Sequence, residues 1–112
     1  MIESSYDCIF CRIVNKQALA DIVYEDDLVV GFWDQNPARP IHILIVPREH
    51  IATLNDIPKD NYILSHIGQV ARIIAEKFKV DQSGYRVFVN VNKGGGQVIF
   101  HLHAHLVANK ND

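Results

Sequence analysis

The first half of the chain alternates short apolar runs with polar breaks. The first ordered element is expected to start near Asp7, with Cys8 to Asn15 as a short helix. Ile22 to Glu25 and Leu28 to Asp34 are expected to be strands, joined by a tight turn at Asp26-Asp27. Ile41 to Val46 is apolar at nearly every position, which favours a third strand in the middle of a sheet.

The second half predicts one long helix and two more strands. The helix is expected from about Pro58 to Lys79, with Asp56 as its cap and Pro58 in its first turn. Tyr85 to Val91 and His101 to Ala108 are expected to be strands. The apolar residues that share one face of the helix are Ile63, Ile67, Val70, Ile74 and Phe78. The order of elements predicts an α+β fold: a mainly antiparallel sheet of about five strands, with one long and one short helix.

Composition narrows the class of protein. A chain of 112 residues with 48% apolar and 21% charged residues fits one globular domain spanning residues 1–112. The formal net charge of −2 argues against a nucleic-acid partner. No signal peptide and no membrane-spanning segment is recognisable. Two cysteines are too few for a disulfide framework, so a cytoplasmic location is expected.

Three histidines alternate near the end of the chain, at His101, His103 and His105. In a strand, residues two apart point to the same face, so the three imidazoles are expected on one side of the sheet. Packing alone explains such a cluster poorly, because each buried ring needs partners for two nitrogens. Two chemistries remain open: a metal site, or covalent catalysis with one imidazole as nucleophile.

The glycine run Gly94-Gly95-Gly96-Gln97 lies just before the histidines. Glycines let backbone N–H groups approach an anion closely, although such a run is often only a flexible turn. Together with the histidines, it favours phosphate chemistry over a metal site.

These residues resemble a known family. The segment from Gly95 to Val107 is similar to the His-φ-His-φ-His-φ-φ signature of the histidine-triad (HIT) superfamily, where φ is an apolar residue. The resemblance extends from Asp7 to Val107. Five further segments resemble the Hint branch: Tyr24 to Asp27, Phe32 to Asp34, Ile41 to Pro47, His50 with Ile51, and Gly84 to Arg86.

The resemblance implies a homodimer with a sheet continuous across its interface. It also implies hydrolysis or transfer at the α-phosphate of a purine nucleotide substrate (AMP- or GMP-like), preferably a nucleoside phosphoramidate. His103 would be the nucleophile that forms a nucleotidyl-histidine intermediate. His105 would stand near the leaving group and the phosphate oxygens, and His101 would orient His103 with His42 behind it. No catalytic metal is required by this scheme.

The same resemblance implies a nucleotide pocket. Asp34 would accept hydrogen bonds from the ribose hydroxyls, and Asn90 would lie beside the sugar and phosphate. Gly96, Gln97 and a protonated His105 are the expected donors to the developing phosphoryl charge. The residues expected to enclose the base are Ile9, Phe10, Phe32 and Leu44.

Three features depart from the Hint pattern. Val98 occupies a phosphate-side position where these proteins often have Ser or Glu, so the contacts to phosphate are expected to differ. Ala104 is smaller than the usual residue between the histidines. The chain ends soon after the triad, whereas some relatives have a longer tail that reaches the partner's active site.

Cys8 and Cys11 form a Cys-x-x-Cys motif. A thioredoxin-type redox pair is disfavoured, because no βαβ unit surrounds it. Two incidental thiols, or half of a structural zinc site completed by His50 and His101, remain. Some HIT proteins carry zinc at the matching positions, so structural Zn²⁺ is expected here.

Two other functions stay open at this stage. One is a dinucleoside polyphosphate hydrolase that uses the same histidine. The other is a zinc-stabilised nucleotide-binding or interaction protein with little turnover.

Overall fold

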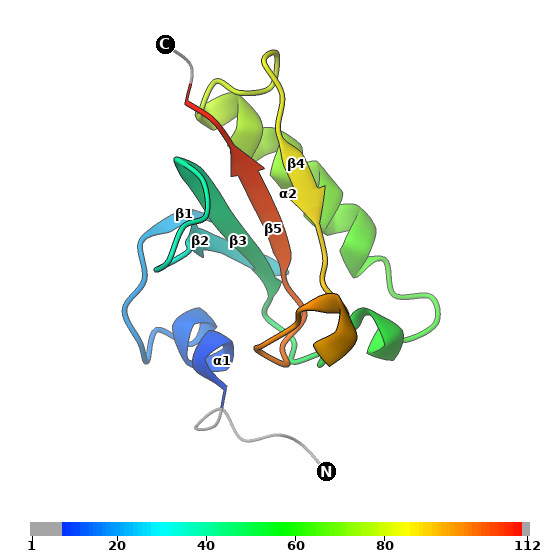
Figure 1. Ribbon diagram of the computed structural model, residues 1–112. Coiled ribbons are helices and arrows are strands. Elements are labelled where there is room, and N and C mark those ends of the chain that lie inside the picture. Colours follow the sequence, from blue (N-terminus) through cyan, green and yellow to red (C-terminus); the bar gives the residue numbers. More distant parts are fainter. Residues whose placement is uncertain (1–7, 111–112) are drawn as a thin grey trace.

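The computed structural model describes residues 8–110 and contains one antiparallel sheet with a helix on each side (Figure 1). The strand order is β1-β2-β3-β5-β4. The strands are β1 (Ile22–Glu25), β2 (Val29–Trp33), β3 (Ile41–Pro47), β4 (Arg86–Phe88) and β5 (Ala104–Ala108), and the helices are α1 (Ile9–Val14) and α2 (Ile63–Lys77). The expected α+β fold is confirmed, and β1, β2 and β3 lie within one residue of their predicted bounds.

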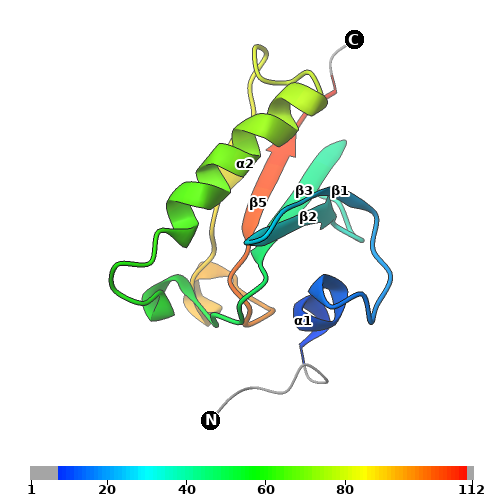
Figure 2. The ribbon, with the colours of Figure 1, turned by 180° about the vertical axis from the view of Figure 1, so that it is seen from behind.

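The two faces of the sheet carry separate cores. On one face, alternate residues of β3 such as Ile43 and Ile45 pack with the buried stripe of α2, which lies across the sheet in Figure 2. On the other face, Leu44 and Val46 pack with α1. Because side chains alternate along a strand, His42 on β3 and His105 on β5 share the α1 face with Leu44.

Helix α2 begins later than expected, at Ile63 instead of Pro58. Asp60 has a left-handed backbone conformation (φ 66°), which an α-helix does not tolerate, so residues 58–61 form a turn. Asp56 is also not the cap of α2, because its carboxylate accepts hydrogen bonds from Thr53 in a separate 3-10 helix, Leu54–Asp56. Among residues 8–110, no helix has the length and apolar character needed to cross a membrane.

The last two strands are shorter than predicted, and for one reason. The His101–His103 backbone is committed to other partners: the Leu102 N–H donates to the Ile51 carbonyl, and the His101 carbonyl accepts from the His103 ring. The β5 ladder therefore begins only at Ala104, and β4, whose one partner among the described strands is β5, reaches no further than Phe88. Of the three triad histidines, only His105 lies within a strand.

The turn between β1 and β2 is built around the Asp26 carboxylate. One oxygen accepts from the backbone N–H groups of Leu28 and Val29 at 2.8 and 2.9 Å. The other accepts from the Tyr24 hydroxyl and from Nε2 of His66 on α2, both at 2.7 Å. Burial by itself raises the pKa of Asp26, but these four hydrogen bonds outweigh it and bring that pKa well below its usual range.

Asp26→Asn is expected to destabilise the protein by about 1–2 kcal/mol at neutral pH, because an amide N–H₂ then faces two hydrogen-bond donors. The carboxylate's pKa is lower in the folded than in the unfolded chain, so its contribution is present above the unfolded pKa and is lost as pH falls below about 4. Urea unfolding at pH 7 and pH 3 measures this. The exposed neighbour Asp27 provides the control, Asp27→Asn; an equal loss there would contradict the assignment.

Candidate functional site

A cavity of about 1000 Å³ opens between α1 and the sheet. The residues that line it include ten of the expected site residues: Ile9, Phe10, Phe32, Asp34, Leu44, Asn90, Gly96, Val98, His103 and His105. The residues that the sequence analysis missed are Ile13, Leu19, Ala20, Asp21, Trp33, Gln35, Asn36, Pro37 and Ile99. Ile13 lies one helical turn from Ile9 and Phe10, so helical spacing was a usable signal for it.

One end of the cavity is apolar. The Phe10 ring on α1 meets the Phe32 ring on β2 edge to face, with centroids 5.5 Å apart. Leu44 on β3 and Ile9 on α1 complete this wall. Such a lining suits a flat, weakly polar group, as an aromatic base is.

Asp34 follows β2 and lines the same cavity as the apolar wall, His103 and His105. One carboxylate oxygen accepts from the Asn36 N–H at 2.8 Å, which holds the side chain in place. The second oxygen lies 3.5 Å from Nε2 of His42 and belongs to a side chain that is 21% exposed and lines the cavity. This oxygen can accept a hydrogen bond from a ligand hydroxyl.

His103 carries a nitrogen suited to attack. Its Nδ1–H donates to the His101 carbonyl at 2.7 Å, which assigns the proton to Nδ1 and leaves a lone pair on Nε2. Burial lowers the pKa of His103, against the opposing effects of the His101 carbonyl and Asp34. The ring is therefore neutral near pH 7, with its nucleophilic nitrogen available.

His105 is held by a chain of hydrogen bonds from the backbone. The Ala38 N–H donates to Nδ1 of His42 at 3.0 Å, so a neutral His42 carries its proton on Nε2. That Nε2–H donates in turn to Nδ1 of His105, also at 3.0 Å. The proton of His105 is thereby assigned to its Nε2, which is buried and has no hydrogen-bond partner among the described residues.

His105 is consequently a neutral donor and not the protonated imidazole that we expected. Burial, His103 and His42 together lower the pKa of His105 to about 4. The hydrogen bond from His42 also leaves no room for a second proton on Nδ1. The His105 ring lines the cavity, and its Nε2–H is a donor without a partner among the described residues, so an anionic group that reaches this atom would accept one hydrogen bond from it.

The backbone hydrogen bonds of the glycine-rich loop are closed within the loop. The N–H groups of Gly96 and Gln97 donate to the Lys93 and Asn92 carbonyls, both at 3.0 Å, and their expected role as phosphate donors stays a prediction. The buried Gln97 side chain donates to two backbone carbonyls and accepts from the Asn92 N–H. Gln97 therefore supports the loop from behind, and the lining of the cavity contains Gly96 and Val98 instead.

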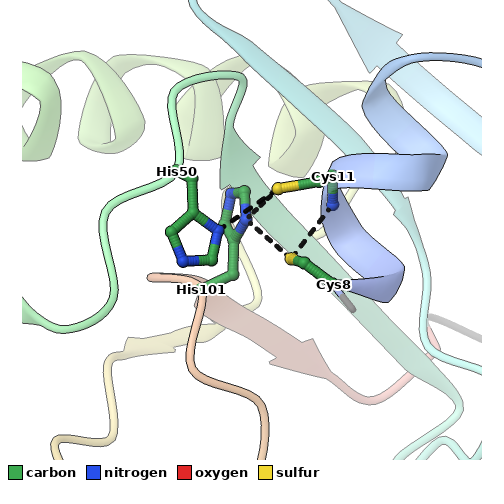
Figure 3. Close-up of side chains that lie close together, drawn as sticks. All are labelled: Cys8, Cys11, His50 and His101. Carbon is green, nitrogen blue, oxygen red and sulfur yellow. Dashed lines mark hydrogen bonds between the residues drawn. The ribbon is translucent and has the colours of Figure 1, made fainter. Parts of the chain in front are cut away.

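The second cluster, drawn in Figure 3, joins Cys8, Cys11, His50 and His101. Nδ1 of His101 lies 3.2 Å from the Cys8 sulfur and 3.5 Å from the Cys11 sulfur, and Nδ1 of His50 lies 3.2 Å from the Cys11 sulfur. All four ligand atoms lie within 4.8 Å of one another. This compact set of two sulfurs and two nitrogens suits a tetrahedral metal site.

The tautomer of His101 favours metal binding. Its Nε2–H donates to the Pro47 carbonyl at 2.8 Å, so the lone pair of Nδ1 points at the two sulfurs. Burial lowers the pKa of His101 to about 4, which keeps the ring neutral as a ligand must be.

Asp34, His42 and His105 also lie close enough to hold a metal ion, but their hydrogen bonds oppose it. To bind a metal through Nε2, His42 would have to carry its proton on Nδ1, where the Ala38 N–H already donates. Asp34, His42 and His105 are therefore better suited to hydrogen bonding with a ligand than to binding a metal ion.

Comparison with known proteins settles the family. The HIT domain family model matches residues 15–112 of the chain. The chain belongs to the HIT family. A purine nucleoside phosphoramidase from Escherichia coli is 40% identical over 93% of this chain and 88% of its own length.

Two solved structures agree with this HIT assignment. A histidine triad protein from Clostridium difficile superposes with a TM-score of 0.92 and 46% identity, over 99% of this chain and 96% of that one. A zinc-bound histidine triad family protein from Mycobacterium smegmatis superposes with a TM-score of 0.82 and 31% identity, over 96% of this chain and 78% of that one. The resemblance inferred from the sequence is confirmed.

Proposed function

We propose that this HIT protein hydrolyses nucleoside phosphoramidates, with AMP- or GMP-like nucleotides as the transferred group. A hydrolytic role has the support of its family membership and of the Escherichia coli relative's name. The observation that carries the proposal is the neutral His103, whose unprotonated Nε2 belongs to a ring in the cavity wall near Asp34.

In the proposed reaction, the base lies between Phe10 and Leu44, and the Asp34 oxygen that faces His42 accepts from the ribose hydroxyls. Nε2 of His103 attacks the α-phosphorus, and the His101 carbonyl stabilises the positive charge that develops on the ring. The Nε2–H of His105 donates to the phosphoryl group as charge develops there. The phosphorus–nitrogen bond of the substrate breaks as the amine takes up a proton from solvent and leaves. Water then attacks the phosphorus, the bond to Nε2 of His103 breaks and returns its electron pair to the ring, and the nucleotide is released while the proton of that water passes to solvent.

The metal cluster has a separate role in this proposal. Zn²⁺ bound by Cys8, Cys11, His50 and His101 would tie the start of α1 to the loops before α2 and β5 (Figure 3). A closed set of four protein ligands leaves no position for substrate, so the metal would be structural.

A homodimer is also part of the proposal. Within residues 8–110, strand β4 has a sheet partner on one side only, and its Val87 side chain is 42% exposed. An unpaired edge of this kind is a template for pairing with a second copy.

Turnover with a covalent intermediate tests the proposed function. Purified protein is mixed with adenosine 5′-phosphoramidate, quenched in base and weighed by mass spectrometry, while AMP release is followed in parallel. We expect an added adenylyl group on the protein and catalytic AMP release that persists under chelation. Binding of AMP without turnover or adduct would instead indicate a nucleotide-binding protein.

A further inference from the structure

Phe88 contacts His105 but does not line the cavity. It lies on β4 directly opposite His105 on β5, as register partners. The two rings are stacked, with centroids 4.6 Å apart and planes within 6° of parallel. Phe88 is not among the residues that line the cavity, and its ring reaches the site through the stack on His105.

The stack supplies a restraint that hydrogen bonding lacks. The bond from His42 holds Nδ1 of His105 at 3.0 Å, but one hydrogen bond tolerates a range of angles and leaves the ring some rotation about its Cβ–Cγ bond. A flat neighbour 4.6 Å away opposes that rotation, because tilting would drive the ring edge into the Phe88 ring. Bond and stack together determine where Nε2 points.

Phe88 is itself held in place. The guanidinium carbon of Arg86, two residues earlier on the same strand, lies 5.1 Å from the centroid of the Phe88 ring, a cation–π distance. The His105 ring is also tilted 57° against His103, with centroids 5.0 Å apart. A change in the plane of His105 would therefore alter the geometry between the donor and the nucleophile.

We propose that Phe88 is a positioning residue that holds the plane of the His105 ring, so that its Nε2–H is aimed at the reacting phosphoryl group. This inference rests on the proposed function. It assigns to β4 a part in catalysis that neither the triad motif nor the lining of the cavity indicates.

Phe88→Ile and Phe88→Tyr test this role. Isoleucine keeps an apolar side chain that suits a strand but removes the flat ring, whereas tyrosine keeps the stack. With adenosine 5′-phosphoramidate, we expect Phe88→Ile to lower kcat about tenfold while the AMP dissociation constant stays within about twofold, because misorientation acts on the transition state. Phe88→Tyr should restore kcat to near the wild-type value, and the unfolding midpoints should agree.

NMR of the imidazole groups gives a readout that does not depend on turnover. In the wild type, the His105 ring protons should show the ring-current shift of a stacked phenyl group and the Nε2–H tautomer. Phe88→Ile should remove that shift, and Phe88→Tyr should keep it. Unchanged shifts or an unchanged kcat in Phe88→Ile, equal losses of kcat in both variants, or a parallel loss of AMP affinity would overturn the proposal. Absence of wild-type turnover would instead contradict the proposed function, and the shifts would still decide whether Phe88 holds the ring.

Discussion

Replacing His103 by alanine is expected to reduce phosphoramidate turnover roughly 10⁴-fold or more, the scale seen when a catalytic nucleophile is removed. No other described nitrogen in the cavity combines the same features. His105 presents its Nε2–H, and its Nδ1 accepts from His42, so neither nitrogen of that ring offers a lone pair for attack. The adenylyl adduct should disappear together with turnover, as measured by AMP release and by the mass of the intact protein.

Two further variants separate loss of the nucleophile from loss of structure. His103→Asn keeps an amide N–H that can donate to the His101 carbonyl, yet it has no nucleophilic nitrogen, so it should be as inactive as the alanine variant. His66→Gln, on α2 and outside the cavity, should keep wild-type activity. Substantial turnover in both His103 variants would exclude His103 as the nucleophile.

Removal of the metal is expected to produce the largest loss of stability. Zinc that binds only the folded protein contributes about 3–4 kcal/mol when its free concentration is roughly 10²–10³ times its dissociation constant. Chelation should therefore lower the unfolding midpoint by about 10–20 °C for a chain of this size. Thermal unfolding with and without chelator measures the effect, and metal analysis should find one zinc per chain.

The sequence offers a clean control for that measurement, because Cys8 and Cys11 are its only two cysteines. The double variant Cys8→Ser/Cys11→Ser lacks both sulfur ligands. Its midpoint should match that of the chelated wild type and should not respond to chelator. Purified protein without stoichiometric zinc, or a wild-type midpoint that ignores chelation, would refute the structural metal site.

Much of the fold was predictable because runs and spacings of apolar residues indicate which segments form strands and which face of a helix is buried. The apolar run of Ile41–Pro47 identified the central strand, and the spacing of Ile63, Ile67, Val70 and Ile74 identified the buried face of α2. The start of α2 was predicted wrongly because Asp56 and Pro58 both suit the beginning of a helix, whereas in the structure Asp56 belongs to the 3-10 helix and Pro58 begins a turn. Only the positive φ of Asp60 decides between a helix and a turn there.

The sequence likewise predicted some features of the candidate site and not others. The alternating histidines marked the site, but the prediction that all three share one face of a strand was wrong, because only His105 lies in β5 and His101 belongs to the cluster with Cys8, Cys11 and His50. Spacing marked the two cysteines. Hydrogen-bond partners were not predictable, because the carbonyls of Pro47 and His101 and the N–H of Ala38 carry no side-chain signal. Those backbone groups decide which nitrogen of each ring holds a proton, and so which histidine attacks, which donates and which suits a metal. Phe88 escaped notice for the same reason, since only the strand register places it against His105.

The separation of the two cores on opposite faces of one sheet has a consequence for how this sequence can change. Residues beneath α2, such as Ile43 and Leu106, never reach the cavity, whereas Leu44 and His105, their immediate neighbours along the strands, line it. Volume-conserving substitutions on the α2 face can therefore accumulate, or be selected in the laboratory for thermal stability, without changing the residues that line the cavity. The opposite face should be where inherited variation alters substrate choice.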